Sequence, residues 1–278
     1  IDLVVTGIPL DTATTNRPGA RFGPRAIRAA STHMAWERPY GMKFDPFDRL
    51  AVVDYGDCLF DFGKPESIPG DIQSHIETII NQGPSTLSFG GDHFVTYPIL
   101  CAYAKKYQTP ISLIHFDAHS DTWRDDEEER IDHGTMFYKA MKQGMIDPKQ
   151  SVQIGLRTEN PDTFDFNILD GDWVHKNGID AVIEKTFSIV GNRPVYMTFD
   201  IDCLDPSYAP GTGTPVCGGL TTHQAMGIIR GLMGINLIGM DVVEVAPAYD
   251  ISEITALAAS HIAMEMISVF ASKPEFES

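Results

Sequence analysis

Short apolar runs alternate with segments of helical periodicity along the whole chain, and this alternation constrains the fold more than any other feature. Such runs are typical of strands that are buried on both faces of a parallel sheet. They are Leu3–Thr6, Leu50–Val53, Thr86–Phe89, Ile111–Phe116, Ser151–Ile154, Pro194–Phe199 and Asn236–Val243. The helical segments are Pro24–Ala30, Asp71–Asn81, Tyr97–Lys106, His133–Gln143, Gly178–Val190, Thr222–Leu232 and Ser252–Ser268. The pattern predicts an α/β fold in which helices cover both faces of one doubly wound parallel sheet of up to eight strands.

Nothing in the sequence divides the chain into separate units. Its 278 residues show no internal repeat, low-complexity tract or linker, so we expect a single domain over residues 1–278. No run approaches the ~20 apolar residues of a transmembrane helix. The opening residues, IDLVVTGIPL, lack the basic region of a secretory signal. Four cysteines without a C-x-x-C pair predict buried thiols in a reducing compartment, the cytoplasm.

The formal net charge of −17 at pH 7 limits the classes of partner. An acidic chain repels nucleic acid and anionic membrane surfaces, so we expect neither as a partner. The same charge favours small cationic ligands. An acidic soluble enzyme with any kind of substrate would account for it equally well.

The segment ISLIHFDAHSDT, residues 111–122, joins a predicted strand to three metal-type ligands. Asp117, His119 and Asp121 occupy alternate positions directly after the apolar run. In extended backbone alternate side chains share one face, so we expect the three to converge. Open α/β sheets bind ligands beyond the carboxyl ends of their strands, where these residues lie. The alternative is a polar loop whose acids are solvated or hydrogen-bonded.

Two further predicted strands end in side chains of the same kind. His93 follows the turn in TLSFGGDHF. The alternative is that the Gly-Gly pair binds phosphate, but the lysine of a phosphate-binding loop does not follow it. Asp200 and Asp202 follow the strand in VYMTFDIDCLDP. These aspartates could cap a turn, but two like charges on one face of a buried strand are costly unless a cation joins them.

Together these segments supply four aspartates and two histidines at one edge of the predicted sheet. They are His93, Asp117, His119, Asp121, Asp200 and Asp202. Four carboxylates with neutral imidazoles balance the charge of two divalent ions. Oxygen-rich ligation with imidazole suits Mn²⁺, with Mg²⁺, Co²⁺, Ni²⁺ and Zn²⁺ as alternatives. Bridged ions lie roughly 3.5–4 Å apart and lower the pKa of a shared water, which makes hydroxide available near neutral pH.

Two more residues are candidates for the site. Glu244 lies near a strand exit in IGMDVVEVAP, where a structural hydrogen-bond acceptor is the alternative. His133 precedes a predicted helix in DHGTMF, a position that capping and core histidines also occupy. Neither residue identifies a catalyst by itself.

The motifs GGDH, DAHSD, DHGTMF, FDIDCLDP and DVVEVAP, in this order, resemble the signatures of the arginase–agmatinase (ureohydrolase) family. The resemblance extends from about Gly7 to Ala271 and is closest to the bacterial agmatinase branch. It implies an arginase-like fold with an eight-stranded parallel sheet, a homotrimer or homohexamer, and two Mn²⁺ ions per chain. It also implies hydrolysis of the guanidinium group of agmatine to urea and putrescine, by attack of a hydroxide that bridges the metal ions.

The resemblance further implies a role for each candidate residue. One manganese takes His93 and Asp121, the other takes His119 and Asp202, and Asp117 and Asp200 bridge the two. Glu244 receives the guanidinium, Asp121 passes a proton, and His133 relays it to or from solvent. A guanidinium stays protonated at physiological pH and its planar fork matches a carboxylate, which agrees with the role of Glu244.

Three other functions stay open at this level. Another guanidino-compound hydrolase, such as a guanidinobutyrase or an arginase, would carry the same metal motifs. A zinc deacetylase of the histone-deacetylase type would use one metal, which the second set of ligands disfavours. A metal-dependent assembly or regulatory protein would be expected to lack ligands or Glu244, and all of these are present.

The stretch TWRDDEEERID indicates which charge the far end of the substrate carries. Its acids, residues 125–129 and Asp132, outnumber Arg124 and Arg130, and its position between two site motifs predicts a place at the pocket mouth. Arginases hold the substrate's α-carboxylate with neutral Asn and Ser donors in this loop, and such residues are not evident here. An acidic rim would attract the amine of agmatine, although a simply solvated loop is an equal alternative.

Overall fold

The computed structural model describes residues 1–32, 34, 38–127 and 129–276. These residues form an eight-stranded sheet in the order β2-β1-β3-β8-β7-β4-β5-β6, in which every neighbouring pair is parallel. The strands are β1 (Leu3–Ile8), β2 (Val52–Asp57), β3 (Ser85–Gly90), β4 (Ser112–Phe116), β5 (Val152–Ile154), β6 (Asn167–Leu169), β7 (Val195–Asp200) and β8 (Leu237–Val243). The predicted α/β fold with an eight-stranded parallel sheet is therefore confirmed.

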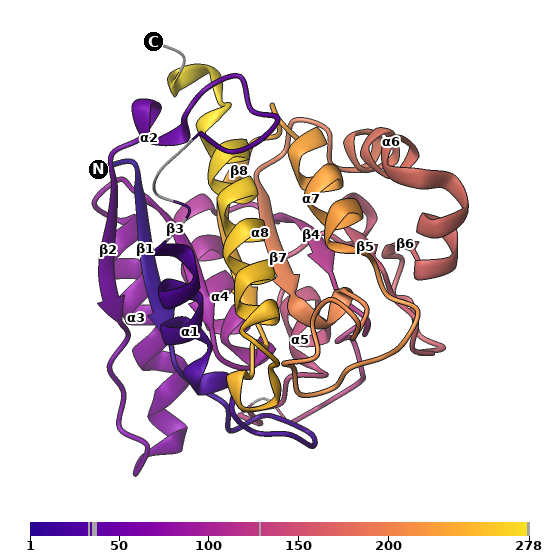
Figure 1. Ribbon diagram of the computed structural model, residues 1–278. Helices are drawn as coiled ribbons and strands as arrows, with labels where there is room; N and C mark the ends of the chain where they lie inside the picture. Colours follow the sequence, from indigo (N-terminus) through magenta and orange to yellow (C-terminus); the bar gives the residue numbers. More distant parts are fainter. Residues whose placement is uncertain (33, 35–37, 128, 277–278) are drawn as a thin grey trace.

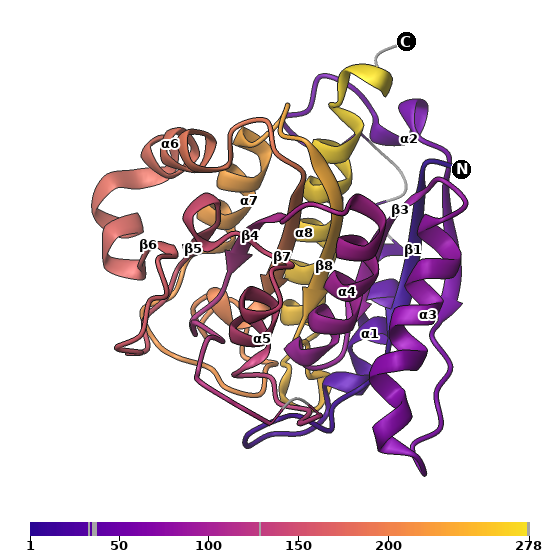
Figure 2. The same ribbon diagram turned by 180° about the vertical axis from the view of Figure 1, so that it is seen from behind.

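Helices cover both faces of the sheet and make three layers in all (Figure 1). One helical layer contains α1 (Gly23–Ser31), α6 (Gly171–Val190), α7 (Thr222–Gly231) and α8 (Ile254–Ala271). The other, in front in Figure 2, contains α3 (Ile68–Ile80), α4 (Thr96–Tyr107) and α5 (Met136–Lys142). The short helix α2 (Pro46–Arg49) contacts α8.

Two hydrophobic cores lie between the sheet and the helical layers. One includes Ile262 and Met266 of α8, and the other includes Ile76 of α3 and Ile99 of α4. Helix α8 has the length and hydropathy of a membrane span, but 78% of its 18 residues are buried inside the protein. A helix that is apolar on all sides and buried in this way is a core helix, and α8 packs against α1, α7 and β8.

The structure adds one strand and shifts several predicted helix ends, including the starts of α6 and α5. Strand β6 pairs with β5 through three residues at the sheet edge, too few for a recognisable pattern. Helix α6 begins at Gly171, where the Asp170 side chain accepts a hydrogen bond from Trp173 N. Gly178, where the helix was expected to start, is instead a kink with φ of 82°. The kink interrupts the hydrophobic periodicity, so the sequence shows a regular helical pattern only after it. Helix α5 begins at Met136, which leaves His133 in the preceding turn.

The strand order brings distant parts of the sequence together. Strands β3, β8, β7 and β4 are neighbours at the centre of the sheet. Because all four are parallel, the loops that follow them meet at one edge, the lower edge in Figure 1. The segments that follow Gly90, Phe116, Asp200 and Val243 therefore share one region.

Candidate metal centre and substrate pocket

A turn, and not strand alternation, brings together the side chains that follow β4. The strand ends at Phe116, and residues 117–122 are irregular. Asp121 adopts a left-handed backbone conformation with φ of 52°, which is uncommon for a residue other than glycine. The prediction that Asp117, His119 and Asp121 share one face of an extended strand is therefore wrong, although the turn does bring them together.

Asp200 and Asp202 also lie outside regular strand geometry. Asp200 is the last residue of β7, and Ile201–Cys203 form a turn of 3-10 helix. Asp200 Oδ1 accepts a hydrogen bond of 2.8 Å from Asp202 N and caps this turn. The two carboxylates come from a strand end and a helical turn, so the prediction that they share one strand face is wrong.

His93 lies among three carboxylates. Its Nδ1 atom is 3.0 Å from Asp117 Oδ2, 3.1 Å from Asp121 Oδ2 and 3.2 Å from Asp200 Oδ2. The His93 ring is fully buried, and Nδ1 makes no hydrogen bond of good geometry to any described residue. A ring nitrogen that faces several carboxylate oxygens without a hydrogen bond is typical of a metal ligand.

Hydrogen bonds on the other side of the ring fix the His93 tautomer. The Thr198 hydroxyl donates to Asp241 Oδ1, a carboxylate oxygen that accepts. Thr198 Oγ1 then accepts from His93 Nε2, which is 2.8 Å away. In the neutral ring the proton is on Nε2, and Nδ1 presents a lone pair to the carboxylates. Burial opposes a charge on this ring, but Asp117, Asp121 and Asp200 raise the pKa of His93 well above its ordinary value where no cation offsets them. Lone pairs and negative charges repel each other, so this arrangement fits a cation between them.

A second group surrounds His119 and shares Asp117 with the first. His119 Nδ1 lies 3.3 Å from Asp117 Oδ1 and 3.1 Å from Asp202 Oδ2. The two oxygens of Asp117 therefore face different groups, as those of a bridging carboxylate would. Asp200, the other predicted bridge, faces His93 through Oδ2 and uses Oδ1 in the turn. Five of the six predicted ligands thus fall into two groups that share Asp117, and His115 joins the group of His93, Asp117 and Asp121.

Crowded negative charge dominates the electrostatics of these groups. Burial, and then the charges of Asp202 and Asp117, raise the pKa of Asp200 well above its ordinary range. Burial and the charge of Asp117 also raise the pKa of Asp202. A nearby cation would stabilise the ionised form of both carboxylates. A donor set rich in carboxylate oxygen, with one imidazole in each predicted group, fits divalent ions of the Mn²⁺ class.

Glu244 and His133 form a pair beside the ligand groups. Glu244 follows β8 with φ of 63°, and its Oε1 atom accepts hydrogen bonds of 2.9 Å from both His93 N and His133 Nδ1. Its Oε2 atom is buried and has no hydrogen-bond partner among the described residues. A buried acceptor without a donor is costly and uncommon. The site therefore lacks a donor at Oε2, which a ligand N–H group could supply.

His133 is held at both ring nitrogens. Besides the bond to Glu244, its Nε2 atom lies 2.6 Å from the hydroxyl of Thr15, an exposed residue in the loop after β1. Burial opposes a charge on this ring, but the hydrogen bond and the negative charge of Glu244 raise the pKa of His133 to about 9. The ring can therefore carry a proton at neutral pH.

Some of these residues line a cavity of about 430 Å³, whereas Glu244 and His93 are not among its lining residues. Its wall includes His119, Asp121, Asp200, His133 and Thr15. A concave site of this size, with a few convergent polar groups, suits a small ligand.

The acidic loop brings fewer carboxylates to this cavity than predicted. Of the described residues 125–129, only Asp125 lines the cavity, and Glu128 lies outside the described residues. Asp125 pairs with Lys139 at 3.3 Å, and Asp132, which also lines the cavity, pairs with Arg130 at 3.1 Å. Among the described residues the predicted acidic rim is therefore reduced to Asp125 and Asp132, and a lysine and an arginine pair with them.

Sequence reasoning missed four buried residues that support the ligands. They are His115, Gln153, Thr198 and Asp241. Thr198 and Asp241 lie inside strands β7 and β8, where a buried polar residue in an apolar run is itself a signal. His115 stands two positions before Asp117, and the same two-residue spacing could have identified it. Nothing in the sequence marked Gln153.

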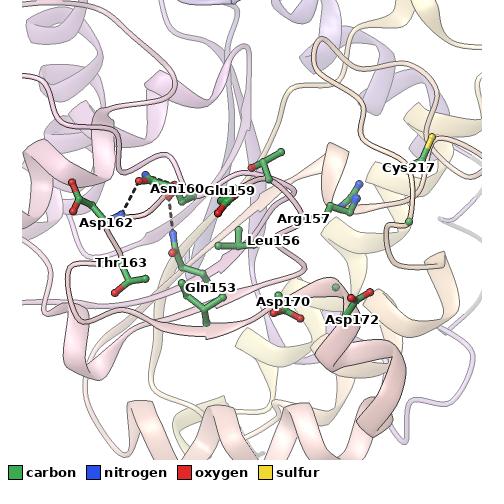
Figure 3. Close-up of a pocket in the computed structure, with 15 residues that line it drawn as sticks. Gln153, Leu156, Arg157, Glu159, Asn160, Asp162, Thr163, Asp170, Asp172 and Cys217 are labelled. Atoms are coloured by element: carbon green, nitrogen blue, oxygen red, sulfur yellow. Dashed lines mark hydrogen bonds between the residues drawn. The ribbon is translucent and has the colours of Figure 1, made fainter.

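A separate cavity of about 470 Å³ lies beside the segment that follows β5 (Figure 3). Gln153, Arg157 and Asn160 are among the residues that line it, whereas the predicted site residues are not. The Arg157 guanidinium donates to backbone carbonyls of Asp202 and Val216, so it braces the turn after β7. This cavity shares no lining residue with the cavity beside His119 and His133 and is separate from it.

Comparisons with known proteins cover nearly the whole chain. The model of the arginase family matches residues 1–268. An agmatinase of Chromobacterium violaceum is 59% identical over 273 residues, which are 98% of this chain and 85% of the relative. The crystal structure of a hypothetical agmatinase from Burkholderia thailandensis is 60% identical with a TM-score of 0.96, over 97% of this chain and 86% of the other. The proclavaminate amidino hydrolase of Streptomyces clavuligerus is 36% identical with a TM-score of 0.88, over 98% and 92% of the two chains. The chain belongs to the arginase family.

Proposed function

We propose that the protein is a binuclear-manganese hydrolase that cleaves agmatine to urea and putrescine. The unpartnered Oε2 atom of Glu244, beside two histidine–carboxylate groups, is the observation that carries this proposal. A guanidinium supplies parallel N–H donors in a planar, charged fork, which is the donor that a buried carboxylate lacks. The similarity to proteins named agmatinase supports agmatine as the guanidino compound.

Six residues would hold the metal ions. They are His93, Asp117, His119, Asp121, Asp200 and Asp202. The shared position of Asp117 and the tautomer of His93 support this assignment. When bound, two Mn²⁺ ions would supply a hydroxide nucleophile near neutral pH and a positive field for developing negative charge.

Glu244 would bind and orient the substrate. Its Oε1 atom is fixed by His93 N and His133 Nδ1, so Oε2 is the oxygen left for the guanidinium. The contact would hold the planar group with its carbon toward the ligand groups. Fixing the reacting carbon in this way lowers the barrier by removing the entropy cost of orientation.

Asp121 and His133 would move the protons. Both line the cavity, and Asp121 belongs to the group around His93, so its carboxylate can take the proton of the hydroxide once its oxygen has bonded to the guanidinium carbon. Passing that proton to the leaving nitrogen, as the bond between this nitrogen and the carbon breaks, would release putrescine and leave urea. His133 would exchange protons with solvent through Nε2, which lies on the Thr15 side of its ring.

A guanidino substrate with a carboxylate tail is the second candidate, because Arg124 and Arg130 line the cavity. Both guanidinium groups already have carboxylate partners, Asp162 at 2.7 Å and Asp132 at 3.1 Å. A substrate carboxylate would have to displace these partners. This pairing disfavours arginine and 4-guanidinobutyrate relative to agmatine, which has no carboxylate.

We also propose the setting in which the enzyme works. We propose that the protein is a homotrimer or homohexamer. Tyr40, Tyr55 and Leu59 are exposed large apolar side chains that contacts between copies would cover. Sedimentation should then give the mass of three or six copies of the 30.7 kDa chain. The four cysteines are free, which supports a reducing compartment such as the cytoplasm. Cys58 and Cys203 are buried as predicted, but Cys217 is exposed, so the prediction of four buried thiols is wrong for it.

Replacing Glu244 by Gln tests the proposed substrate contact. The amide keeps the shape of the side chain but removes the charge that opposes the guanidinium. We expect kcat/KM for agmatine, measured as urea and putrescine release, to fall by at least about 10²-fold. Manganese content should stay at two ions per chain. A variant with wild-type kcat/KM would remove Glu244 from substrate binding, and release of products other than urea and putrescine would contradict the reaction.

A further inference from the structure

His115 lies behind the shared carboxylate of the two ligand groups. It belongs to β4, is fully buried, and its Nε2 atom is 2.7 Å from Asp117 Oδ2. The same oxygen faces His93 Nδ1 at 3.0 Å. The contact therefore acts on one oxygen of Asp117, the one on the His93 side.

Gln153 on β5 fixes the tautomer of His115. The Gln153 amide nitrogen donates to the backbone carbonyl of Ser120 at 2.7 Å, and a carbonyl can only accept. The second hydrogen of the same amide is directed to His115 Nδ1, 3.0 Å away. Nδ1 is therefore the acceptor, the ring proton is on Nε2, and Nε2–H donates to Asp117 Oδ2.

The surroundings hold this chain of hydrogen bonds in place. The His115 ring meets the Phe137 ring edge to face, with centroids 4.6 Å apart, and Gln153 is 1% exposed. The other oxygen of Asp117, Oδ1, has a different support, a hydrogen bond from His119 N. Burying an imidazole and an amide is costly unless both are fully hydrogen-bonded, and here each is paired.

We propose that His115 and Gln153 position Asp117 and thereby raise the affinity of the metal ion on the His93 side. This inference rests on the proposed metal centre and does not depend on the substrate. A hydrogen bond to Oδ2 directs its remaining lone pairs, and loss of such an outer partner commonly weakens metal affinity by about 10–100-fold. His115 and Gln153 are positioning residues, because they act through Asp117.

Three variants separate this role from simple packing. His115→Phe keeps a ring against Phe137 but removes both nitrogens. His115→Gln keeps a nitrogen donor near the place of Nε2. Gln153→Met removes the amide at the wall of the cavity in Figure 3, away from the substrate pocket. His75→Gln is the control, because it changes an imidazole that bonds Thr6 in a different part of the fold.

Manganese titration of the metal-free protein, followed by calorimetry and by electron paramagnetic resonance, gives the test. Wild type and His75→Gln should bind two ions and show the signal of a spin-coupled pair. His115→Phe and Gln153→Met should bind one ion as tightly as wild type and the second about 10–100-fold more weakly. Their coupled signal should then appear only at higher manganese concentration. In His115→Gln the affinity for the second manganese ion should return to within about threefold of the wild-type value.

Two results would overturn the inference. One is wild-type affinity for both ions in His115→Phe and Gln153→Met. The other is an affinity for the second manganese ion that is as weak in His115→Gln as in His115→Phe. This would indicate that His115 acts only through packing. If His115→Phe does not fold, Gln153→Met and His115→Gln decide between the two outcomes. A wild-type protein without a second manganese site would contradict the metal centre itself, whereas an inactive enzyme that binds the pair would contradict only the proposed reaction.

Discussion

Asp121 and Glu244 both hold backbone conformations that favour glycine, with φ of 52° and 63°. Each such conformation costs on the order of 1–3 kcal/mol and persists only where the surroundings impose it. In Glu244 it accompanies a carboxylate whose Oε1 bonds His93 N and His133 Nδ1 while Oε2 stays unpaired. The strain at these two residues therefore coincides with the groups that the proposed reaction uses.

His133→Asn tests the proton relay. Asparagine places its amide near the position of Nδ1, so it can still donate to Glu244, but it cannot exchange a proton at neutral pH. We expect kcat to fall by about 10²–10⁴-fold, the usual contribution of a general acid or base. Manganese content and thermal stability should not change. A variant that turns over near the wild-type rate would exclude His133 from proton transfer.

The part of the candidate site that the sequence predicted best was which side chains lie close together. Acids and imidazoles at strand exits are visible in the sequence, and the turn and strand order place them together. Their local geometry was not predictable, because the positive φ of Asp121 depends on the surrounding loops. Gln153 could not be identified either, because only the pairing of β4 with β5 brings it to His115.

At the scale of helices and strands, the hydrophobic period and the length of each segment decided what the sequence could predict. Strands such as β4 and β8 are buried apolar runs of five and seven residues, and they were found with small shifts in their ends. Strand β6 has three residues and no clear pattern. The order of strands in the sheet could not be read from the sequence, because it depends on which crossover connections pack best.

The turn after β7 should carry a pH-dependent part of the stability. Asp205 accepts hydrogen bonds from the backbone N–H groups of Ser207, Gly218 and Gly219. Burial opposes ionisation, but these hydrogen bonds lower the pKa of Asp205 to about 2. Because the folded pKa lies below the unfolded value, the stabilisation is present above about pH 4 and is lost as pH falls toward 2.

Asp205→Asn should therefore lower the free energy of unfolding at pH 7 by about 1 kcal/mol. The difference from wild type should shrink as pH falls below about 4, where the unfolded wild-type carboxylate takes up a proton. Denaturant unfolding of the metal-free proteins between pH 7 and pH 3 measures it. A difference that stays constant over this range would show that the Asp205 charge does not stabilise the turn.

At the scale of the whole molecule, one sheet connects every part of the described chain. The order β2-β1-β3-β8-β7-β4-β5-β6 mixes early and late strands, so neither half could form its sheet alone. This topology supports the proposal of a single domain over residues 1–278. The net charge of −17 includes the carboxylates of the candidate metal ligands, and bound cations would offset these charges.

Metal removal should lower the stability of this whole unit. Two ions that bind the folded state alone, each at 100 times its Kd, would stabilise it by about 5 kcal/mol in total. We expect chelation to abolish activity and to lower Tm by roughly 10 °C or more, with one melting transition before and after. Added Mn²⁺ should restore both. An unchanged Tm in fully metal-free protein would argue against the centre, and two separate transitions would argue against a single domain.

The central claim is hydrolysis of a guanidinium compound that lacks a carboxylate, and the most direct test is urea release from three substrates. Manganese-loaded protein should be assayed with agmatine, arginine and 4-guanidinobutyrate under identical conditions. We predict that kcat/KM for agmatine exceeds that for either carboxylate-bearing substrate by at least ~10-fold, a difference of ~1.4 kcal/mol. Faster turnover of arginine or 4-guanidinobutyrate than of agmatine would contradict it.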